Sequence, residues 1–172
     1  SRDLFVSGYL EFKPIEELTF RGTVGFDMKD VQADQYIPTT TKKGFSMNGQ
    51  GSKQNAKTQM NLVNLIGTYA KTFGGRHDLN VMAGVEYKKS SWEGMGIVTS
   101  QFPYDGALMN NLGISEQEKP TISSNKGANE MASFISRLNY TFDSKYILTV
   151  NLRVDGSSNF SKEHQWGVFP GV

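Results

Sequence analysis

Apolar and polar residues alternate along four stretches of the chain. Every second residue from Leu18 to Met28 is apolar or glycine, and the residues between them are mostly polar. The same period of two recurs in Asp78–Lys88, Ser133–Asp143 and Tyr146–Asp155. Successive side chains of a β-strand point to opposite faces, so this period is typical of a strand with one apolar and one polar face. The pattern predicts four such strands.

Two weaker stretches, Leu4–Lys13 and Met60–Phe73, are rich in strand-forming residues and are predicted as further strands. The connections fall into two classes. Short segments with turn composition lie at 14–17, 74–77 and 143–145, whereas long polar segments cover 30–56, roughly 90–130 and the residues after Asp155. The predicted fold class is therefore all-β, an antiparallel up-and-down meander of about six or seven strands with its short turns at one end.

Strands with one apolar face occur in two physical settings. In a soluble sandwich the apolar face packs into the core, and in a membrane barrel it contacts lipid. The clearest predicted strands have about 11 residues, longer than the usual five or six and long enough to cross a bilayer when tilted. The long connections lie at one end only, and aromatic residues gather near strand ends (Tyr69, Phe73, Tyr87, Trp92, Tyr140, Phe142 and Tyr146). These features favour a segment of a large transmembrane β-barrel, with the sandwich as the alternative.

Composition and charge exclude several classes of function. The 172 residues contain no cysteine, which excludes disulfides, thiolate metal sites and cysteine nucleophiles. Because 18 Lys and Arg stand against 17 Asp and Glu, no basic excess supports nucleic-acid binding. The longest segment without these charged residues, Thr58–Ala70, is shorter than the roughly 20 residues that a membrane-spanning helix needs.

Catalytic and metal-binding residues are not expected either. His77 and His164 have no acid or nucleophile at a useful spacing, so no catalytic residue is assigned. The segment Asp155–Phe160 contains a single carboxylate, which gives too few oxygen ligands for calcium. We therefore expect a protein that is not an enzyme and that binds no metal or cofactor.

A motif with several fixed positions lies near the end of the chain. It contains Arg137-Leu-Asn139-Tyr140, then Lys145-Tyr146-Ile-Leu148, Arg153-Val-Asp155-Gly156-Ser157-Ser158-Asn-Phe160 and Trp166-Gly167-Val-Phe169-Pro170. This order resembles the mid-barrel signature of SusC/RagA-like TonB-dependent outer-membrane transporters, with Gly171 where serine is usual. Upstream, His77–Glu86 resembles a strand of the same family, and Leu18–Gly22 resembles the hairpin before it.

The resemblance implies an outer-membrane importer of large nutrients, typically oligosaccharides or peptides. Such a transporter is energised by the TonB complex and is capped by a SusD-like surface lipoprotein. Residues 1–172 would then form part of the barrel domain, in contact with outer-membrane lipid. The sequence shows no plug domain, TonB box or signal peptide, and this segment alone is not expected to transport. A soluble all-β binding or adhesion module with recognition loops is the alternative function.

Two groups of residues are candidates for functional contacts. In a complete barrel, the polar faces of the last predicted hairpin would look into the lumen (Arg137, Asn139, Thr141, Asn151, Arg153 and Asp155). Three aromatic residues of the long segment 90–130, Trp92, Phe102 and Tyr104, are candidates for ligand binding because aromatic faces stack on sugar rings. Packing within the loop is the alternative role of these three residues.

Overall fold

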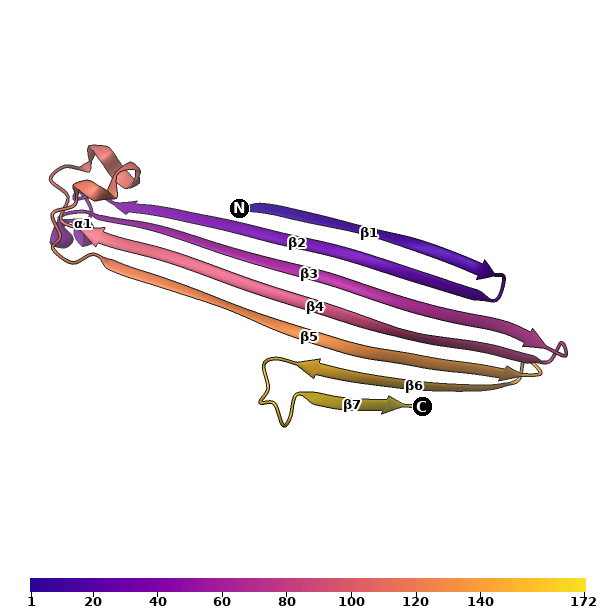
Figure 1. The fold of residues 1–172 in the computed structure, drawn as a ribbon. Coiled ribbons are helices and arrows are strands. Elements are labelled where there is room, and N and C mark those ends of the chain that lie inside the picture. The colour runs from indigo at the N-terminus through magenta and orange to yellow at the C-terminus, as the bar shows by residue number, and fades with distance from the viewer. The chain divides into compact units, whose positions relative to one another are not determined.

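The computed structural model describes the whole chain, residues 1–172. Seven strands form one sheet in which every strand pairs with its neighbours in chain order (Figure 1). The strands are β1 (Arg2–Ile15), β2 (Leu18–Ile37), β3 (Gln50–Phe73), β4 (His77–Ser100), β5 (Thr121–Phe142), β6 (Tyr146–Ser157) and β7 (Trp166–Gly171). Three short helices, α1 (Lys42–Met47), η1 (Asp105–Asn110) and η2 (Leu112–Ile114), lie in the connections. The predicted all-β meander is confirmed.

No helix of the chain has both the length and the apolar character that crossing a membrane requires.

The predicted connections are too long at three places. β2 continues to Ile37 and β3 begins at Gln50, so the connection predicted over 30–56 covers only 38–49. The connection predicted over 90–130 covers only 101–120, and the segment after Asp155 contains the end of β6 and the whole of β7. These bounds were wrong because the apolar alternation stops before the strands do. In the first half of β5 backbone pairing continues where both faces are mostly polar, since pairing needs no apolar side chain. The end of β4 and β7 contain apolar residues, but without a regular alternation.

The chain contains two compact units. The turn unit comprises residues 5–27, 60–90 and 128–172 and holds the three hairpin turns. The loop unit comprises residues 1–4, 28–59 and 91–127 and holds α1, η1 and η2.

Two hairpin turns of the turn unit have the same backbone geometry. Gly74 and Gly75 have φ of 56° and 66°, and Asp143 and Ser144 have φ of 51° and 52°. Positive φ at both central residues is the signature of a type I′ turn, whose twist matches that of the flanking strands. Glycine adopts this geometry freely, whereas a residue with a Cβ adopts it at a cost. The two turns fix how β3 meets β4 and how β5 meets β6.

The apolar residues of the turn unit do not form a buried core. Phe102 of the loop unit is the one buried apolar residue of the chain, at 1% exposed, whereas Leu65 and Phe134 of the turn unit are 52% and 54% exposed. Large apolar side chains that stay open in this way mark a surface that another phase or molecule covers. The two faces of the turn unit are therefore candidate functional surfaces.

Candidate functional surfaces

The register of β5 against β6 brings all six predicted lumen-facing residues to one face of the turn unit. Residues directly opposite each other share a face, and Arg137 stands opposite Asn151 while Asn139 stands opposite Thr149. The Arg137 Nε donates to Asn151 Oδ1 at 2.7 Å, and the Thr149 hydroxyl donates to Asn139 Oδ1 at 3.0 Å. The six residues thus lie on one face, which is polar except for Ile135 and Ile147. That this face lines a lumen stays a prediction.

Arg153 is the electrostatic centre of the polar face. Its Nε donates to both carboxylate oxygens of Asp155 at 2.8 Å, and its Nη2 donates to the Ser133 hydroxyl at 3.1 Å. Glu86 of β4 lies 3.8 Å from the same guanidinium. Two carboxylates against one guanidinium leave a net negative charge here. The cluster is suited to hold a further cationic or hydrogen-bond-donating group.

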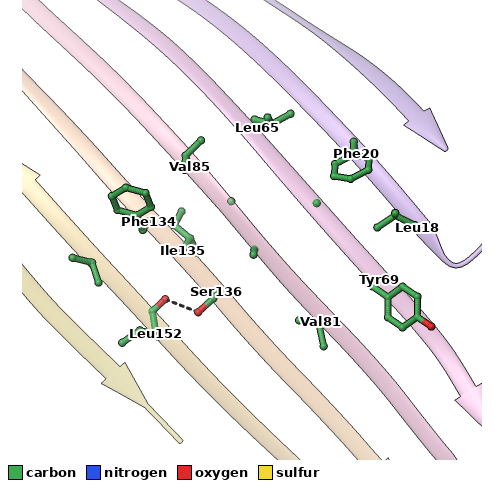
Figure 2. Close-up of a pocket in the computed structure, with 14 residues that line it drawn as sticks. Leu18, Phe20, Leu65, Tyr69, Val81, Val85, Phe134, Ile135, Ser136 and Leu152 are labelled. Carbon is green, nitrogen blue, oxygen red and sulfur yellow. Dashed lines mark hydrogen bonds between the residues drawn. The ribbon is translucent and has the colours of Figure 1, made fainter. Parts of the chain in front are cut away.

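The opposite face of the turn unit is apolar. Phe134 stands opposite Val154, Leu138 opposite Val150, and Tyr140 opposite Leu148. Ile135 and Ile147, which break the alternation in the sequence, fall on the polar face, and Ser136 falls on the apolar face opposite Leu152. The Ser136 hydroxyl donates to the Leu152 carbonyl at 3.5 Å, so it contacts the backbone (Figure 2). This face therefore presents few polar groups to its surroundings.

Small residues leave a shallow hollow of about 590 Å³ in the apolar face (Figure 2). Gly67, Ala83 and Ser136 contribute its floor on three neighbouring strands, because each carries little or no side chain. Larger side chains surround the floor: Leu18, Phe20, Leu65, Tyr69, Val81, Val85, Phe134, Leu152 and Val154. The hollow has no charged lining residue, so it does not have the composition of a site for a polar ligand.

Charged side chains bound the apolar face at both ends, and aromatic side chains gather at the end beside the hairpin turns. Beside the hairpin turns, Lys71 pairs with Glu17 at 3.0 Å and Lys145 approaches Asp143 at 3.5 Å. At the other end Lys89 pairs with Glu130 at 2.8 Å. The ring of Phe142, near the turns, lies 4.9 Å from that of His77 and 6.4 Å from that of Tyr146. The apolar face is thus a band of finite height with polar edges.

The loop unit has its own buried centre around Phe102. The Tyr36 ring packs edge-on against the Phe102 ring, with 5.2 Å between centroids. A Cβ on Gly51 would come within 3.0 Å of the Phe102 ring and 2.5 Å of Leu112, so glycine is required for this packing. Phe102 was a candidate for ligand binding, and its 1% exposure favours the alternative role of loop packing.

Asp105 holds the connection between β4 and β5 to the start of the connection between β2 and β3. Its carboxylate accepts from the Tyr36 hydroxyl at 2.8 Å, from the Thr39 hydroxyl at 2.6 Å and from the Thr39 backbone N–H at 3.1 Å. These hydrogen bonds, first those of Thr39, lower the pKa of Asp105. Burial, together with the neighbouring carboxylate, raises the pKa of Tyr36 to about 12. Sequence reasoning missed this contact, because a single Asp in Pro-Tyr-Asp-Gly reads only as a turn residue.

Trp92 and Tyr104 are exposed at 42% and 59%. Trp92 lies beside a groove of about 410 Å³ that three strands line with residues 54–58, 92–96 and 123–125. The structure does not bring the three aromatic candidates together, because Phe102 is buried and Tyr104 is absent from this groove. Ligand binding by Trp92 and Tyr104 stays a prediction. Sequence reasoning missed the groove, whose small residues carry no periodic signal.

No family model matches the chain. TonB-dependent receptor P3 of Formosa agariphila is 34% identical over 163 residues, which are 94% of this chain and 16% of that receptor. TonB-dependent receptor SusC of Bacteroides thetaiotaomicron is 31% identical over 114 residues, 63% of this chain and 10% of SusC. The RagAB peptide transporter contains a chain that matches 96% of this one with a TM-score of 0.87 and 21% identity, over 18% of its own length. The chain thus spans about one sixth of the length of P3.

Proposed function

Because the chain belongs to the SusC-like TonB-dependent receptors, we propose that it forms part of the barrel wall of an outer-membrane nutrient importer. In this proposal its seven strands correspond to one stretch of the receptor barrel, which the similarity of fold to a chain of the RagAB transporter supports. The relatives are named as receptors and transporters, so the chain belongs with transport proteins and not with enzymes. In this proposal the apolar face of the turn unit contacts lipid and its polar face looks inward.

The height of the apolar band carries the proposal. On the apolar face of β5 the first residue after Glu130 is Ala132 and the last before the turn at Asp143 is Phe142, so the band covers residues 132–142. About 11 residues at about 3.3 Å each measure about 36 Å along the strand. A strand tilt of about 40° converts this length to about 28 Å along the membrane normal, close to the roughly 25 Å apolar band of outer-membrane barrels. Charged pairs at both ends then lie at the two headgroup layers.

The partners follow from the family and the polar face. We propose that the complete receptor pairs with a SusD-like surface lipoprotein, draws energy from the TonB complex and imports an oligosaccharide or a peptide. The polar face of β5 and β6, with the Arg153 cluster, would contact protein inside the barrel or water in the lumen. A soluble module is disfavoured by the apolar face, because no part of the turn unit covers it.

Two neighbouring positions test the orientation of the sheet. In the full-length receptor, Leu138→Cys and Asn139→Cys place one thiol on each face of β5, in a stretch that has no cysteine of its own. We expect lipids with a spin label on the acyl chain to quench a fluorophore attached to the thiol of the Leu138→Cys variant. The same fluorophore on the thiol of the Asn139→Cys variant should be unaffected. The receptor should also fractionate with outer membranes. A soluble receptor, or equal quenching in both variants, would contradict the proposal.

A further inference from the structure

We propose that the groove beside Trp92 binds a neutral oligosaccharide, with a sugar ring stacked on the indole. Three strand segments line the groove, and by alternation the residues that share the face of Trp92 are Gln54, Ala56 and Thr58 of β3, Gly94 and Gly96 of β4, and Ser123 and Asn125 of β5. The residues between them in these segments, Lys57 and Glu93 among them, alternate onto the opposite face. The Trp92 groove means the residues on the face of Trp92. This inference rests on the proposed function, since a nutrient importer must contact its cargo, and it names the class of that cargo.

Glycine in the middle of the groove makes room for the polar side chains of β5. A Cβ on Gly94 would lie 2.6 Å from Asn125 Oδ1, and a Cβ on Gly96 would lie 2.9 Å from Ser123 Oγ. The side chains of β5 thus stand where β4 has none, on the same face of the loop unit. The resulting volume of about 410 Å³ is within the range of small-molecule sites. A side chain added at Gly94 or Gly96 would displace the Asn125 or the Ser123 side chain from its place in the groove.

Trp92 lies flat against the sheet. A Cβ on Gly127 would overlap the indole, at 2.5 Å from Cε2, so the ring occupies the space of a side chain at residue 127. One side of the indole is covered in this way, and the residue is still 42% exposed. A fixed aromatic ring with one open face gives a ligand a large contact at little cost in side-chain entropy.

The other polar side chains on the Trp92 face of the groove are neutral. Gln54 and Asn125 present amides, Thr58 and Ser123 present hydroxyls, and together they can donate and accept several hydrogen bonds. Alternation along the strands places Glu93 on the opposite face, where it pairs with Lys126 at 3.9 Å. Amides, hydroxyls and an open aromatic face match the hydroxyls and the C–H face of a sugar. An anionic glycan or a peptide terminus would need a charged partner, and on the Trp92 face of the groove alternation leaves none, because Lys57 and Glu93 lie on the opposite face.

A second Trp–Gly pair in the turn unit separates packing from ligand binding. A Cβ on Gly156 would lie 2.9 Å from three atoms of the Trp166 ring, so Trp166 also fills the space above a strand glycine. Its neighbour is apolar, because the Phe134 ring lies 6.2 Å from it. Filling such a space with an aromatic ring is a known stabilising device in sheets. Trp166 is therefore the matched control for Trp92, since it has the packing without the polar groove.

The test measures binding to the full-length receptor by isothermal titration. The probes are maltohexaose, cellohexaose and xylohexaose as neutral glycans, an alginate hexamer as an anionic glycan, and a mixed hexapeptide pool. We expect one of the neutral glycans to bind. Trp92→Ala should weaken that binding about tenfold, the loss of roughly one stacked aromatic contact. Gly96→Val should weaken it as well, whereas Trp166→Ala and Gly8→Val should not, since nothing lies within 4 Å of a Cβ on Gly8.

The outcomes separate this inference from the proposed function. Heat-modifiable gel mobility shows whether each variant is folded. If Trp92→Ala or Gly96→Val does not fold, the binding measurement is made on Asn125→Ala in its place. Unchanged neutral-glycan affinity in folded Trp92→Ala and Gly96→Val would overturn the role of the groove and leave the importer intact. Binding of the peptide pool or the alginate hexamer alone, or of none of the probes, would overturn the substrate class. Failure of the receptor to reach the outer membrane would overturn the proposed function itself.

Discussion

An arginine scan along β6 measures how deep each residue lies in the bilayer. The apolar face of β6 consists of Tyr146, Leu148, Val150, Leu152 and Val154, whose partners on β5 are also on the apolar face. Each of the five is replaced by arginine in the full-length receptor. Thr149→Arg is the control, because Thr149 lies between Leu148 and Val150 but faces the polar side, opposite Asn139.

The structure gives the expected depth of each position. Val150 lies four residues beyond Tyr146, about 13 Å along the strand and about 10 Å along the membrane normal at a tilt of about 40°. Leu152 lies two residues further, at about 15 Å along the normal. The midplane of a band about 25 Å tall lies about 12.5 Å from its edge, so Val150 and Leu152 lie on either side of it. Arginine should destabilise the folded receptor by about 2–4 kcal/mol at these two positions and by about 0–1 kcal/mol at Tyr146.

Urea unfolding of the receptor in lipid vesicles, followed by tryptophan fluorescence, measures this profile. The expected result is a maximum at Val150 and Leu152 with smaller costs toward both ends of β6. A cost that is uniform along the strand, or greatest at Tyr146, would refute the assignment of this face to lipid. So would a Thr149→Arg variant that loses as much stability as Val150→Arg.

Three further predictions concern single contacts. Asp105→Asn weakens the hydrogen bonds to Tyr36 and Thr39, so amide exchange in residues 101–120 should become faster, whereas Glu118→Gln in the same connection should leave it unchanged. The raised pKa of Tyr36 means that its neutral form stabilises the fold below pH 10 and that this contribution is lost as the pH rises toward about 12. In a pH titration followed by tyrosinate absorbance, the step at the highest pH should therefore be missing from the Tyr36→Phe variant, and an unchanged titration curve would contradict the contact with Asp105. Gly156→Val displaces the Trp166 ring and should cost about 1–3 kcal/mol in urea unfolding, with Gly8→Val as a nearly neutral control.

The strands that alternate in the sequence are the strands whose presence could be predicted. β6 and the second half of β5 have one apolar and one polar face, and their register in the structure places each predicted residue on its predicted side. The first half of β5, around Ser123 and Asn125, has polar residues on both faces. Such a stretch has no amphipathic period, and only the pairing of its backbone with β4 makes it a strand. The connection predicted over 90–130 extended too far into β5 for this reason.

The candidate site was predictable only where a face has a simple composition. The six polar residues of β5 and β6 follow from parity alone, because every second residue of a strand shares a face. The Trp92 groove does not, since it depends on which glycine of β4 stands beside which side chain of β3 and β5. The turn at Gly74 and Gly75 sets the alignment of β3 with β4, but β4 and β5 are joined by the connection 101–120, which has no regular pattern. The burial of Phe102 beneath Tyr36 likewise depends on a contact between residues far apart in the sequence.

The isolated chain 1–172 provides a last test, because its sheet has two unpaired edges. β1 and β7 are the end strands of the sheet, and the free N–H and C=O groups of an edge strand pair readily with another chain. The exposed apolar face of the turn unit favours association as well, since Phe134 is 54% exposed and Leu148 is 47% exposed. We therefore expect the isolated chain to form oligomers in buffer and to become monodisperse in detergent, as measured by size-exclusion chromatography with light scattering. A detergent-free monomer with a cooperative thermal transition would show that this sequence covers its own apolar face, and it would favour the soluble binding module over the barrel wall.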